Sequence, residues 1–522
     1  MRVAEPLSES ERERLAPFVS DLDAPVFALR GLPATTCGAL FARYSRYPGT
    51  LRRLLLDEFA GELDGDAPAS ARDGRAEELY ERVLGEYGDD SVAQLGGVHL
   101  ACEWVSNLLT KVLERPRLGA YLEQSTRYIP FDRPVDGLGY RYHREPELGP
   151  AYERDMDALF EAYGEALATL TPWLAERFPR APGASERAHE RAVRAKALDL
   201  SRGLLPAATL SHVGIFASGQ TFERLVLHLR AEELPEARSC AEQMLAALRT
   251  VAPAFTTRID RPDRGGAWSA FLRRRVEAEA AAAARLGVGE AADPDGGEAV
   301  RLLAVEGDEE RLLAALVFER AGVGEERIEA AVQKLAPDER GALLGELLSG
   351  RENRRHLPGR GLEALRYRFE VVSDYGAFRD LQRHRMLTAQ WQPLGPHLGA
   401  AVPEQARAAG LGGLYERAFE RSCESWRRLD DAGLHVQAPY ALCLAHRIRY
   451  VLDMNAREAM HLIELRSARE GHESYRAIAA RMHELIAAVH PTVAGAMSHR
   501  DDAAEPRLER IEAELRGESR RG

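Results

Sequence analysis

Apolar residues recur at spacings of three and four positions along most of the chain, which is the period of an amphipathic helix. The clearest periodic stretches are residues 151–180, 185–200, 217–247 (with a break at Pro235), 410–432 and 474–488. Two other stretches, 92–112 and 362–381, are more continuously apolar, and we interpret them as buried helices. The pattern predicts a helix-rich protein with a core of substantial size.

Clusters of glycine, proline and aspartate separate these stretches, and the largest change of character falls at residues 259–300. There an alanine- and glutamate-rich run lies between two segments rich in Gly, Pro and Asp, which is typical of a linker. We therefore divide the chain into five parts. They are an N-terminal lead-in (1–36), a first half (37–258), the linker (259–300), a second half (301–495) and a charged, peripheral C-terminal helix (496–522).

The two halves contain similar short motifs in the same order. An R-P-R triplet begins at Arg115, and an R-H-R triplet begins 268 residues later at Arg383. Each half also has a helical stretch that ends on an arginine, Arg230 in the first and Arg466 in the second, 236 residues apart. Because the two offsets differ, the halves are consistent with an internal duplication followed by insertions or deletions.

Residues 115–128 read R-P-R-L-G-A-Y-L-E-Q-S-T-R-Y and form the densest polar cluster of the first half. In an extended segment, the alternation of Glu123, Ser125 and Arg127 places these three side chains on one side. A hydroxyl together with guanidinium groups suits a phosphate or another planar anion, since arginine binds such groups through two hydrogen bonds. A solvated charge cluster is the alternative, because charged stretches usually lie at the surface.

The helix predicted at residues 455–466 carries another candidate cation. Asn455 and Arg466 are eleven positions apart, so they project within about 20° of each other. Arg466 therefore lies beside the apolar side of the helix, and its partner is expected to be either a buried carboxylate or a bound ligand. Arg457 and His461 lie on the other side.

Two basic runs in the second half have different surroundings. The R-H-R triplet at 383–385 directly follows an apolar stretch, which favours a place in the lining of a pocket. The run at 351–356 (R-E-N-R-R-H) lacks that context, and we interpret it as solvated surface.

Composition limits the classes of function. The 522 residues carry a net charge of −12, which argues against general nucleic-acid binding. The first residues are charged, and no apolar run approaches the roughly 20 residues of a membrane span, so a cytoplasmic protein without membrane contact is expected. The five cysteines lie far apart with no C-x-x-C pair, which supports neither a metal site nor a disulfide framework.

Residues 115–128 resemble the signature of the flavin-dependent thymidylate synthase family, which reads R-H-R, two residues, S, two residues, then E-x-S-x-R-Y. Pro116 stands in place of the histidine and Ala120 in place of the first serine. Shorter segments that resemble family elements lie at 41–45 (F-A-R-Y-S), 88–92 (G-D-D-S-V) and 202–206 (R-G-L-L-P).

The second half resembles the same family in a complementary way. Its R-H-R triplet is intact and Thr388 takes the place of the serine, but no E-x-S-x-R-Y follows. Asn455 and Arg457 match the family's N-x-R element, and Arg466 matches its substrate arginine. The first half retains only that arginine, Arg230. Such a division is expected if each composite site needs one intact version of every motif.

The resemblance implies an α+β fold of two fused copies, each helix-rich with a central sheet. It also implies the reductive methylation of dUMP to dTMP, with FAD as cofactor and with methylene-tetrahydrofolate and NADPH as co-substrates. The family forms homotetramers with sites between subunits, so two chains of this protein are expected to form a homodimer that acts as a pseudo-tetramer.

The resemblance also implies roles for single residues, carried over by position. The expected catalytic residues are Arg466 and Arg230. The expected dUMP-binding residues are Arg115, Arg117, Glu123, Ser125, Arg127, Arg202 and Arg383. The expected flavin-binding residues are His384, Arg385, Thr388, Asn455, Arg457 and His461.

Two other functions remain open. A paralogue that binds a nucleotide or a flavin without making dTMP is favoured by Pro116, by Asp89 where the family has histidine, and by the missing E-x-S-x-R-Y after Arg385. A helical scaffold with coincidental motifs is the third hypothesis.

Overall fold

The computed structural model describes residues 7–24, 27–44, 47, 49–59, 94–180, 182, 185–288, 299–502, 507–511 and 514–515. The chain divides into two compact units. Unit 1 consists of Met1–Val105, Val112–Glu123 and Ser211–Ala291, and unit 2 consists of Ser106–Lys111, Gln124–Leu210 and Ala292–Gly522. The first half therefore contributes to both units, whereas the second half lies in unit 2. The G-D-D-S-V segment at 88–92 and Ser45 of the F-A-R-Y-S segment lie outside the described residues.

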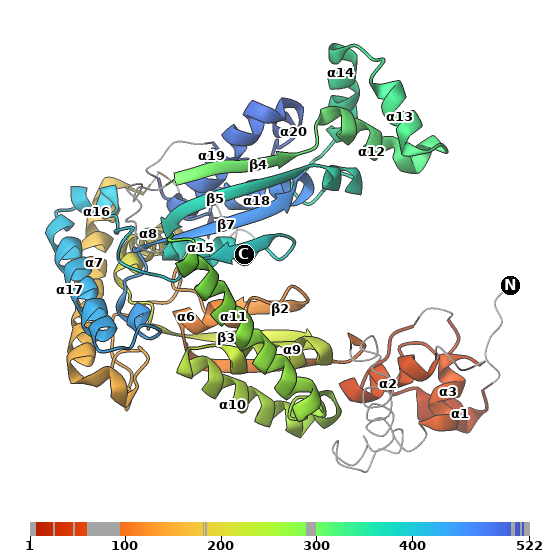
Figure 1. The fold of residues 1–522 in the computed structure, drawn as a ribbon, viewed down its shortest axis with the longest axis horizontal. Helices are drawn as coiled ribbons and strands as arrows, with labels where there is room; N and C mark the ends of the chain where they lie inside the picture. Colours follow the sequence, from red (N-terminus) through yellow and green to blue (C-terminus); the bar gives the residue numbers. More distant parts are fainter. Residues whose placement is uncertain are drawn as a thin grey trace. The chain divides into compact units, whose positions relative to one another are not determined.

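Unit 1 is built on a three-stranded sheet with the order β1 (Gly97–Ser106), β3 (Leu210–Ser218), β2 (Gly119–Glu123). β2 pairs antiparallel with β3. α9 (Gly219–Ala231) follows β3 directly and packs against α10 (Pro235–Val251) and α11 (Ala267–Arg285) (Figure 1). The helices α1 (Glu9–Leu15), α2 (Ala34–Tyr44) and α3 (Leu51–Glu58) precede the sheet in the chain.

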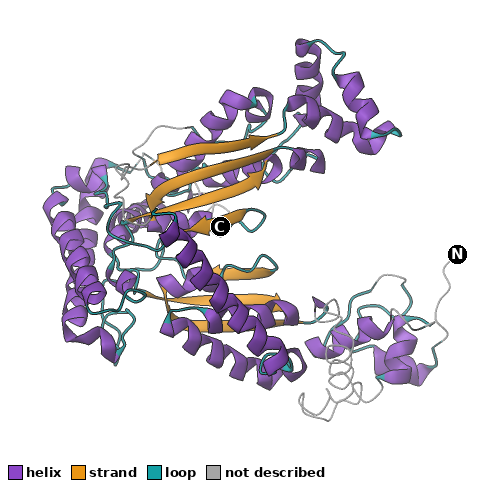
Figure 2. Ribbon diagram, in the orientation of Figure 1, coloured by secondary structure: helices purple, strands orange, loops and turns teal. Residues whose placement is uncertain are grey.

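Unit 2 contains a four-stranded antiparallel sheet with the order β4 (Ala299–Glu306), β5 (Arg366–Asp374), β7 (Arg447–Asn455), β6 (Thr388–Trp391). α18 (Ala456–Arg466) and α19 (Glu473–Val489) pack against each other and against β5 (Figure 2). α7 (Gly149–Arg177) packs against both α8 (Glu186–Ser201) and α17 (Gly412–Asp431).

Besides α15 (Tyr375–Leu381), α17, α18 and α19, five other α-helices lie in the described part of the second half. They are α12 (Glu309–Ala321), α13 (Glu325–Val332), α14 (Pro337–Leu348), α16 (Glu404–Ala408) and α20 (Pro491–Gly495). Among the described residues, no helix combines the length and the apolar character that crossing a membrane requires.

Alternating side chains explain why β7 forms a strand. The even-numbered residues from Ile448 to Met454 are buried, while the residues between them are partly exposed. Where the strand ends, the side chain of Asn455 accepts a hydrogen bond of 2.9 Å from the backbone N–H of Glu458 and so caps the first turn of α18. This cap fixes the point at which the chain turns from strand to helix.

The backbone of unit 2 joins equivalent segments of the two halves in a reciprocal way. The N–H of Ala207 donates to the carbonyl of Leu442 (2.7 Å), and the N–H of Leu444 donates to the carbonyl of Leu205 (2.8 Å). The same exchange links Ala208 to Tyr440 (3.0 Å) and Ala445 to Gly203 (3.0 Å). In each pair of bonds, residues 237 positions apart have the same role, so that Ala207 and Leu444 both donate while Leu442 and Leu205 both accept. Such reciprocity is the mark of an approximate two-fold relation between duplicated segments.

Two of the predicted helices are strands for much of their length. The described part of 92–112 forms β1 and then α6 (Asn107–Leu113), and 362–381 contains β5 and then α15 (Tyr375–Leu381). These interpretations were wrong because a continuously apolar run has no period that separates a buried strand from a buried helix. Aromatic and β-branched residues in both runs favour strands once partner strands are present. The five periodic stretches are confirmed as α7, α8, α9 with α10, α17 and α19.

Candidate functional site

Unit 2 brings together arginines from both halves of the chain around two buried carboxylates. The arginines are Arg127 and Arg202 from the first half and Arg383 and Arg466 from the second, and the carboxylates are Asp199 on α8 and Asp380 on α15. We call these six residues the arginine cluster. The carbonyl of Arg127 and both oxygens of Asp199 also accept from Arg510 (3.1 and 3.4 Å).

Arg127 is fully engaged inside the protein. Its Nε and Nη2 donate to the two oxygens of Asp199 at 2.7 Å each, and its Nη1 donates to the hydroxyl of Tyr475 at 2.7 Å. Burial opposes the charge of Asp199, yet Arg127 and then Arg510 hold the pKa of that carboxyl well below its usual range. A buried, bidentate pair of this kind fixes the orientation of both side chains.

Asp380 is held much more loosely. Its oxygens lie 3.4 Å from Arg202, 3.8 Å from Arg383 and 4.0 Å from Arg466. Burial opposes the charge, but these arginines, led by Arg383, keep the pKa of Asp380 well below its usual range. Arg202 is only 5% exposed, and its buried Nη2 has no hydrogen-bond partner among the described residues. Three guanidinium groups therefore share one carboxylate, and the buried Nη2 of Arg202 remains for an anionic ligand.

Arg466 is hydrogen-bonded to a neutral side chain, while Asp380 lies 4.0 Å away. Its Nε donates to Nε2 of His384 at 2.9 Å, and its guanidinium lies 5.5 Å from the centre of the Tyr475 ring. His384 is 3% exposed, and its Nδ1 lies 2.9 Å from Glu458. Burial, followed by the charge of Arg466, lowers the pKa of His384 well below its usual range, so its imidazole is neutral.

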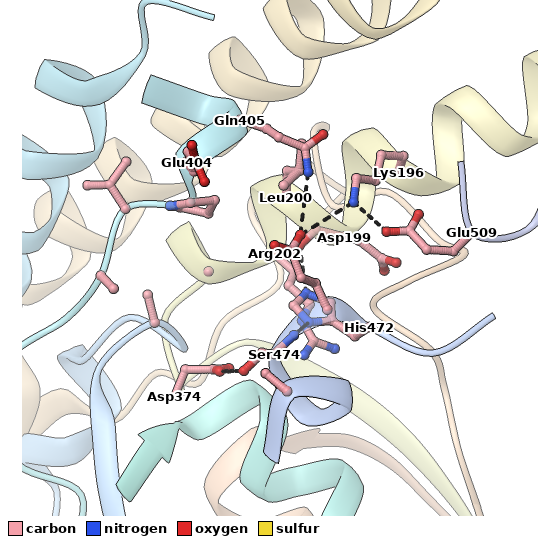
Figure 3. Close-up of a pocket in the computed structure, with 17 residues that line it drawn as sticks. Lys196, Asp199, Leu200, Arg202, Asp374, Glu404, Gln405, His472, Ser474 and Glu509 are labelled. Carbon is pink, nitrogen blue, oxygen red and sulfur yellow. Dashed lines mark hydrogen bonds and ion pairs between the residues drawn. The ribbon is translucent and has the colours of Figure 1, made fainter. Parts of the chain in front are cut away.

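A cavity of about 260 Å³ lies beside Arg202 in unit 2 (Figure 3). Both halves line it, with Lys196, Asp199 and Arg202 from the first and Asp374, Gln405, His472 and Ser474 from the second among the lining residues. Lys196 is paired with Glu509, and Ser474 donates to Asp374. Asp199 and Arg202 thus belong both to the cavity lining and to the arginine cluster.

The alternation expected at residues 123–127 does not continue past the strand. β2 ends at Glu123, which is buried in unit 1, and Ser125 to Arg127 form a turn in unit 2. The hydroxyl of Ser125 accepts the backbone N–H of Arg127 (3.2 Å), a local bond that favours a turn over an extended strand. Arg115 and Arg117 are exposed residues of unit 1.

Arg230, the other expected catalytic residue, is bound by carboxylates in unit 1. Its Nε and Nη2 donate to the two oxygens of Glu242 at 2.7 and 2.9 Å, and its Nη1 donates to Asp260 at 3.0 Å. Its guanidinium charge is therefore already matched by two acidic side chains.

Comparison with known proteins decides the family. The sequence profile of the thymidylate synthase complementing protein family matches residues 52–254 and again residues 301–492. The chain belongs to this family. The double match confirms the tandem duplication, and with the two sheets it confirms the α+β fold of two fused copies. Family membership supports an activity of the thymidylate synthase kind.

Curated relatives match this chain over more than nine-tenths of its length. A UPF0159 protein of Chlamydia muridarum is 36% identical over 528 residues, which is 98% of each chain. A UPF0159 protein of Thermoplasma acidophilum is 31% identical over 512 residues, 92% of this chain and 98% of its own. Among solved structures, a UMP/dUMP methylase PolB from Streptomyces cacaoi, bound with 5-Br dUMP, is 19% identical with a TM-score of 0.32. It covers 39% of this chain and 95% of its own.

The residues expected to bind a flavin differ in the polar groups that remain after the hydrogen bonds they make within the protein. Asn455 caps α18 through its oxygen, Arg457 donates from Nε to the carbonyl of Pro358 (3.1 Å), and His461 is half-buried one turn further along α18. These groups keep polar hydrogens that suit the phosphates or ring edge of a flavin. His384 does not fit that role, because both of its ring nitrogens are engaged within the protein.

The remaining expected flavin-binding residues lie near β6. Arg385 is exposed in the loop before the strand, and Thr388 is the first residue of β6, opposite Asp453 of β7. The structure places both in unit 2, as it does Asn455, Arg457 and His461.

Several residues of the site were not predicted from the sequence. Asp199, Asp380, Tyr475, Glu458 and Arg510 hold the cluster in place, and none belongs to a motif of the family. The position of Asp380, three residues before the R-H-R triplet on the apolar stretch, is the one signal that pointed to it.

Two surface assignments were wrong in part as well. The run at 351–356 is largely exposed, as expected, but the side chain of Arg351 is 5% exposed and pairs with the buried Glu464 of α18. In the C-terminal segment, Glu509 and Arg510 are 3% and 4% exposed, so its described part is not peripheral. In both cases a distant partner of opposite charge makes burial tolerable, and a local pattern cannot reveal that partner.

Proposed function

We propose that this protein is a flavin-dependent thymidylate synthase that methylates dUMP, with its nucleotide site at the arginine cluster of unit 2. The observation that carries the proposal is the loose sharing of Asp380 by Arg202, Arg383 and Arg466. The buried Nη2 of Arg202, which has no partner among the described residues, suits the phosphate of a nucleotide. The reaction class comes from membership of the family.

The arginines of the cluster have different proposed roles, according to the hydrogen bonds that each already makes within the protein. Arg202, with its unpartnered Nη2, and Arg383, which is 36% exposed, are the groups for phosphate oxygens. All three guanidinium nitrogens of Arg127 already donate to Asp199 or Tyr475, so Arg127 forms a rigid part of the site lining. The two Nη groups of Arg466 are proposed to bind the uracil ring, because its hydrogen bond to His384 uses only Nε. A cation at a ring carbonyl stabilises the negative charge that develops when carbon 5 reacts.

A bound flavin supplies the redox step of this chemistry, with NADPH as reductant and methylene-tetrahydrofolate as the one-carbon donor. Asn455, Arg457 and His461 on α18, with Arg385 and Thr388 beside β6, are the residues proposed to hold it. His384 is assigned instead to the support of Arg466.

We further propose a homodimer that acts as a pseudo-tetramer. The reciprocal bonds between residues 203–208 and 440–445 already join two copies within one chain. A second chain then has to supply only the remaining pair of copies.

The alternative is a protein that binds dUMP or flavin without making dTMP. It is favoured by the state of the first half, where Arg230 is bound by Glu242 and Asp260. Release of tritium from dUMP labelled at carbon 5, in the presence of FAD, NADPH and methylene-tetrahydrofolate, separates the two functions. We expect release by the wild type and a flavin spectrum that shifts when dUMP is added.

The matched variants are Arg466→Gln and Arg481→Gln. Arg481 lies on α19, is 53% exposed and pairs only with Glu484, so its replacement controls for the loss of one positive charge. Tritium release should be lost in the first variant and kept in the second. Binding of dUMP without tritium release in the wild type selects the alternative, and a colourless protein that binds neither dUMP nor FAD rejects both.

A further inference from the structure

Glu458, His384 and Arg466 form a chain of hydrogen bonds inside unit 2. Glu458 lies 2.9 Å from Nδ1 of His384, and Nε2 of the same ring lies 2.9 Å from Nε of Arg466. The side chains of Glu458 and His384 are 9% and 3% exposed, so water has little access to either bond. Because α18 carries both Glu458 and Arg466, the ring of His384 links two positions on one helix two turns apart.

The direction of both bonds follows from the chemistry of arginine. The Nε–H of Arg466 can only donate, so Nε2 of His384 must accept and cannot carry a hydrogen. A neutral imidazole then carries its hydrogen on Nδ1, which donates to Glu458. The acceptor at Glu458 therefore selects the tautomer that Arg466 needs.

The surrounding charges keep the ring in this state. Burial and the charges of Arg466 and His461 on α18 lower its pKa well below the usual range, whereas Asp380 on α15 acts in the opposite direction without offsetting them. In a protonated ring, Nε2 would carry a hydrogen directed at the Nε–H of Arg466, so that two donors would face each other. Burial raises the pKa of Glu458, but the carboxylate and the carboxylic acid both present an oxygen that accepts from Nδ1.

We propose that Glu458 is a positioning residue, which sets the tautomer of His384 and thereby directs the Nη groups of Arg466 toward the nucleotide. The part of this inference that concerns the nucleotide rests on the proposed function. The position 237 residues earlier, at the same point after the helix cap of α9, is Thr221, and its hydroxyl donates to the carbonyl of Leu118 (2.9 Å). The device therefore belongs to the second half alone.

Three substitutions distinguish the role of Glu458 as a hydrogen-bond acceptor from the effect of its charge. Glu458→Met removes the acceptor, whereas Glu458→Gln keeps a carbonyl oxygen for Nδ1–H and removes only the charge. Glu484→Gln is the control, because this carboxylate is 62% exposed on α19 and pairs only with Arg481. The cap of α18 uses the backbone N–H of residue 458 and is retained in both variants.

The first readout is the ¹⁵N spectrum of histidine-labelled protein, with His384 assigned through His384→Gln. We expect a hydrogen on Nδ1 and none on Nε2 in the wild type, in Glu458→Gln and in Glu484→Gln. Glu458→Met should lose this single tautomer. This readout needs no activity, so it tests the tautomer even if dUMP proves not to be the substrate.

The second readout is steady-state tritium release. Glu458→Met should lower kcat by roughly 10- to 100-fold with a smaller change in the KM for dUMP, because a misdirected Arg466 fails mainly in the transition state. Glu458→Gln should restore most of kcat. In a His384→Gln background, whose amide oxygen can accept from Arg466 directly, Glu458→Met should cause little further loss.

A hydrogen on Nε2 of His384 in the wild type would overturn the proposal, as would an unchanged tautomer in Glu458→Met. Equal loss of kcat in Glu458→Met and Glu458→Gln would assign the effect to charge and overturn the role as an acceptor. If the tautomers follow expectation while the wild type releases no tritium and binds no dUMP, the proposed function fails and the support of Arg466 by Glu458 stands.

Discussion

The helix ends at Arg230 and Arg466 show how two copies of one element have diverged. Both arginines end a helix that directly follows a strand, α9 after β3 and α18 after β7, and both helices begin at a side-chain cap. Arg230 is held by two carboxylates at 2.7 to 3.0 Å. Arg466 is held by a neutral imidazole, with Asp380 no closer than 4.0 Å.

The difference lies in the charge that remains after each arginine has been fixed in place. Glu242 and Asp260 balance the charge of Arg230, with Asp260 also shared by Arg249, so an anionic ligand would have to displace one of these carboxylates. A neutral acceptor fixes Arg466 through one nitrogen and leaves its charge in place. Duplication thus allows one copy to hold the arginine near its helix end between carboxylates while the other holds its own through a neutral side chain.

The largest expected effect comes from replacing the two arginines in turn. Arg466→Gln should lower kcat/KM for dUMP by about 100- to 1,000-fold, since it removes a cation aimed at the reacting ring. Arg230→Gln should change it by less than about threefold, because Glu242 and Asp260 are 60% and 49% exposed and can be solvated when Arg230 is gone. Equal losses in the two variants would remove the distinction between the halves.

The next largest effect is on stability and concerns the carboxylates. Asp199→Asn leaves Arg127 and Arg510 without their buried partner and should lower the free energy of unfolding by about 3–5 kcal/mol. Glu242→Gln breaks the exposed pair with Arg230 and should cost no more than about 1 kcal/mol. Urea titrations at pH 7 measure both, and a cost for Glu242→Gln as large as that for Asp199→Asn would contradict this reading of the structure.

Neutral histidines make the second half sensitive to acid. Burial lowers the pKa of His384 and lowers that of His446 to about 4, below the value of 6.5 in the unfolded chain. As pH falls below 6.5 the unfolded state takes up protons that the folded state does not, so stability falls with pH. His446→Gln should remove about 2 kcal/mol of the difference in unfolding free energy between pH 7.5 and pH 5. An unchanged difference would mean that His446 titrates normally in the folded protein.

The smallest expected effect separates two roles of Ser125. Its hydroxyl already accepts the backbone N–H of Arg127 (3.2 Å), so Ser125→Ala should cost roughly 1 kcal/mol of stability. A change in the dissociation constant of dUMP below threefold would assign Ser125 to the turn. A change above tenfold would instead support the contact with dUMP that the family resemblance implies.

The sequence allowed prediction of the features that depend on local pattern or on shared motifs. The periodic helices, the duplication and the family were found because each leaves a regular signature in the chain. The strands β1 and β5 were missed because apolar runs do not reveal whether a partner strand is present. The partners of Arg127 and Arg351 lie 72 and 113 residues away, at Asp199 and Glu464, and no local pattern records such pairs.

The neutral partner of Arg466 was the least accessible feature. The helical wheel placed Arg466 beside the apolar side of α18 and so required a partner, but the two partners considered were a buried carboxylate and a bound ligand. His384 was taken from the family motif as a flavin contact, and nothing in the sequence pointed to a bond between the two. Only the fold of unit 2, which brings α15 and α18 together, supplies that information.

The most direct test of a composite site is the stoichiometry of dUMP binding measured by titration calorimetry on the full chain. The account predicts one site per chain, lost in both Arg202→Met and Arg466→Gln, although these arginines come from different halves, and kept in Arg230→Gln. Two equivalent sites per chain, or a site that survives either of the first two substitutions, would contradict it.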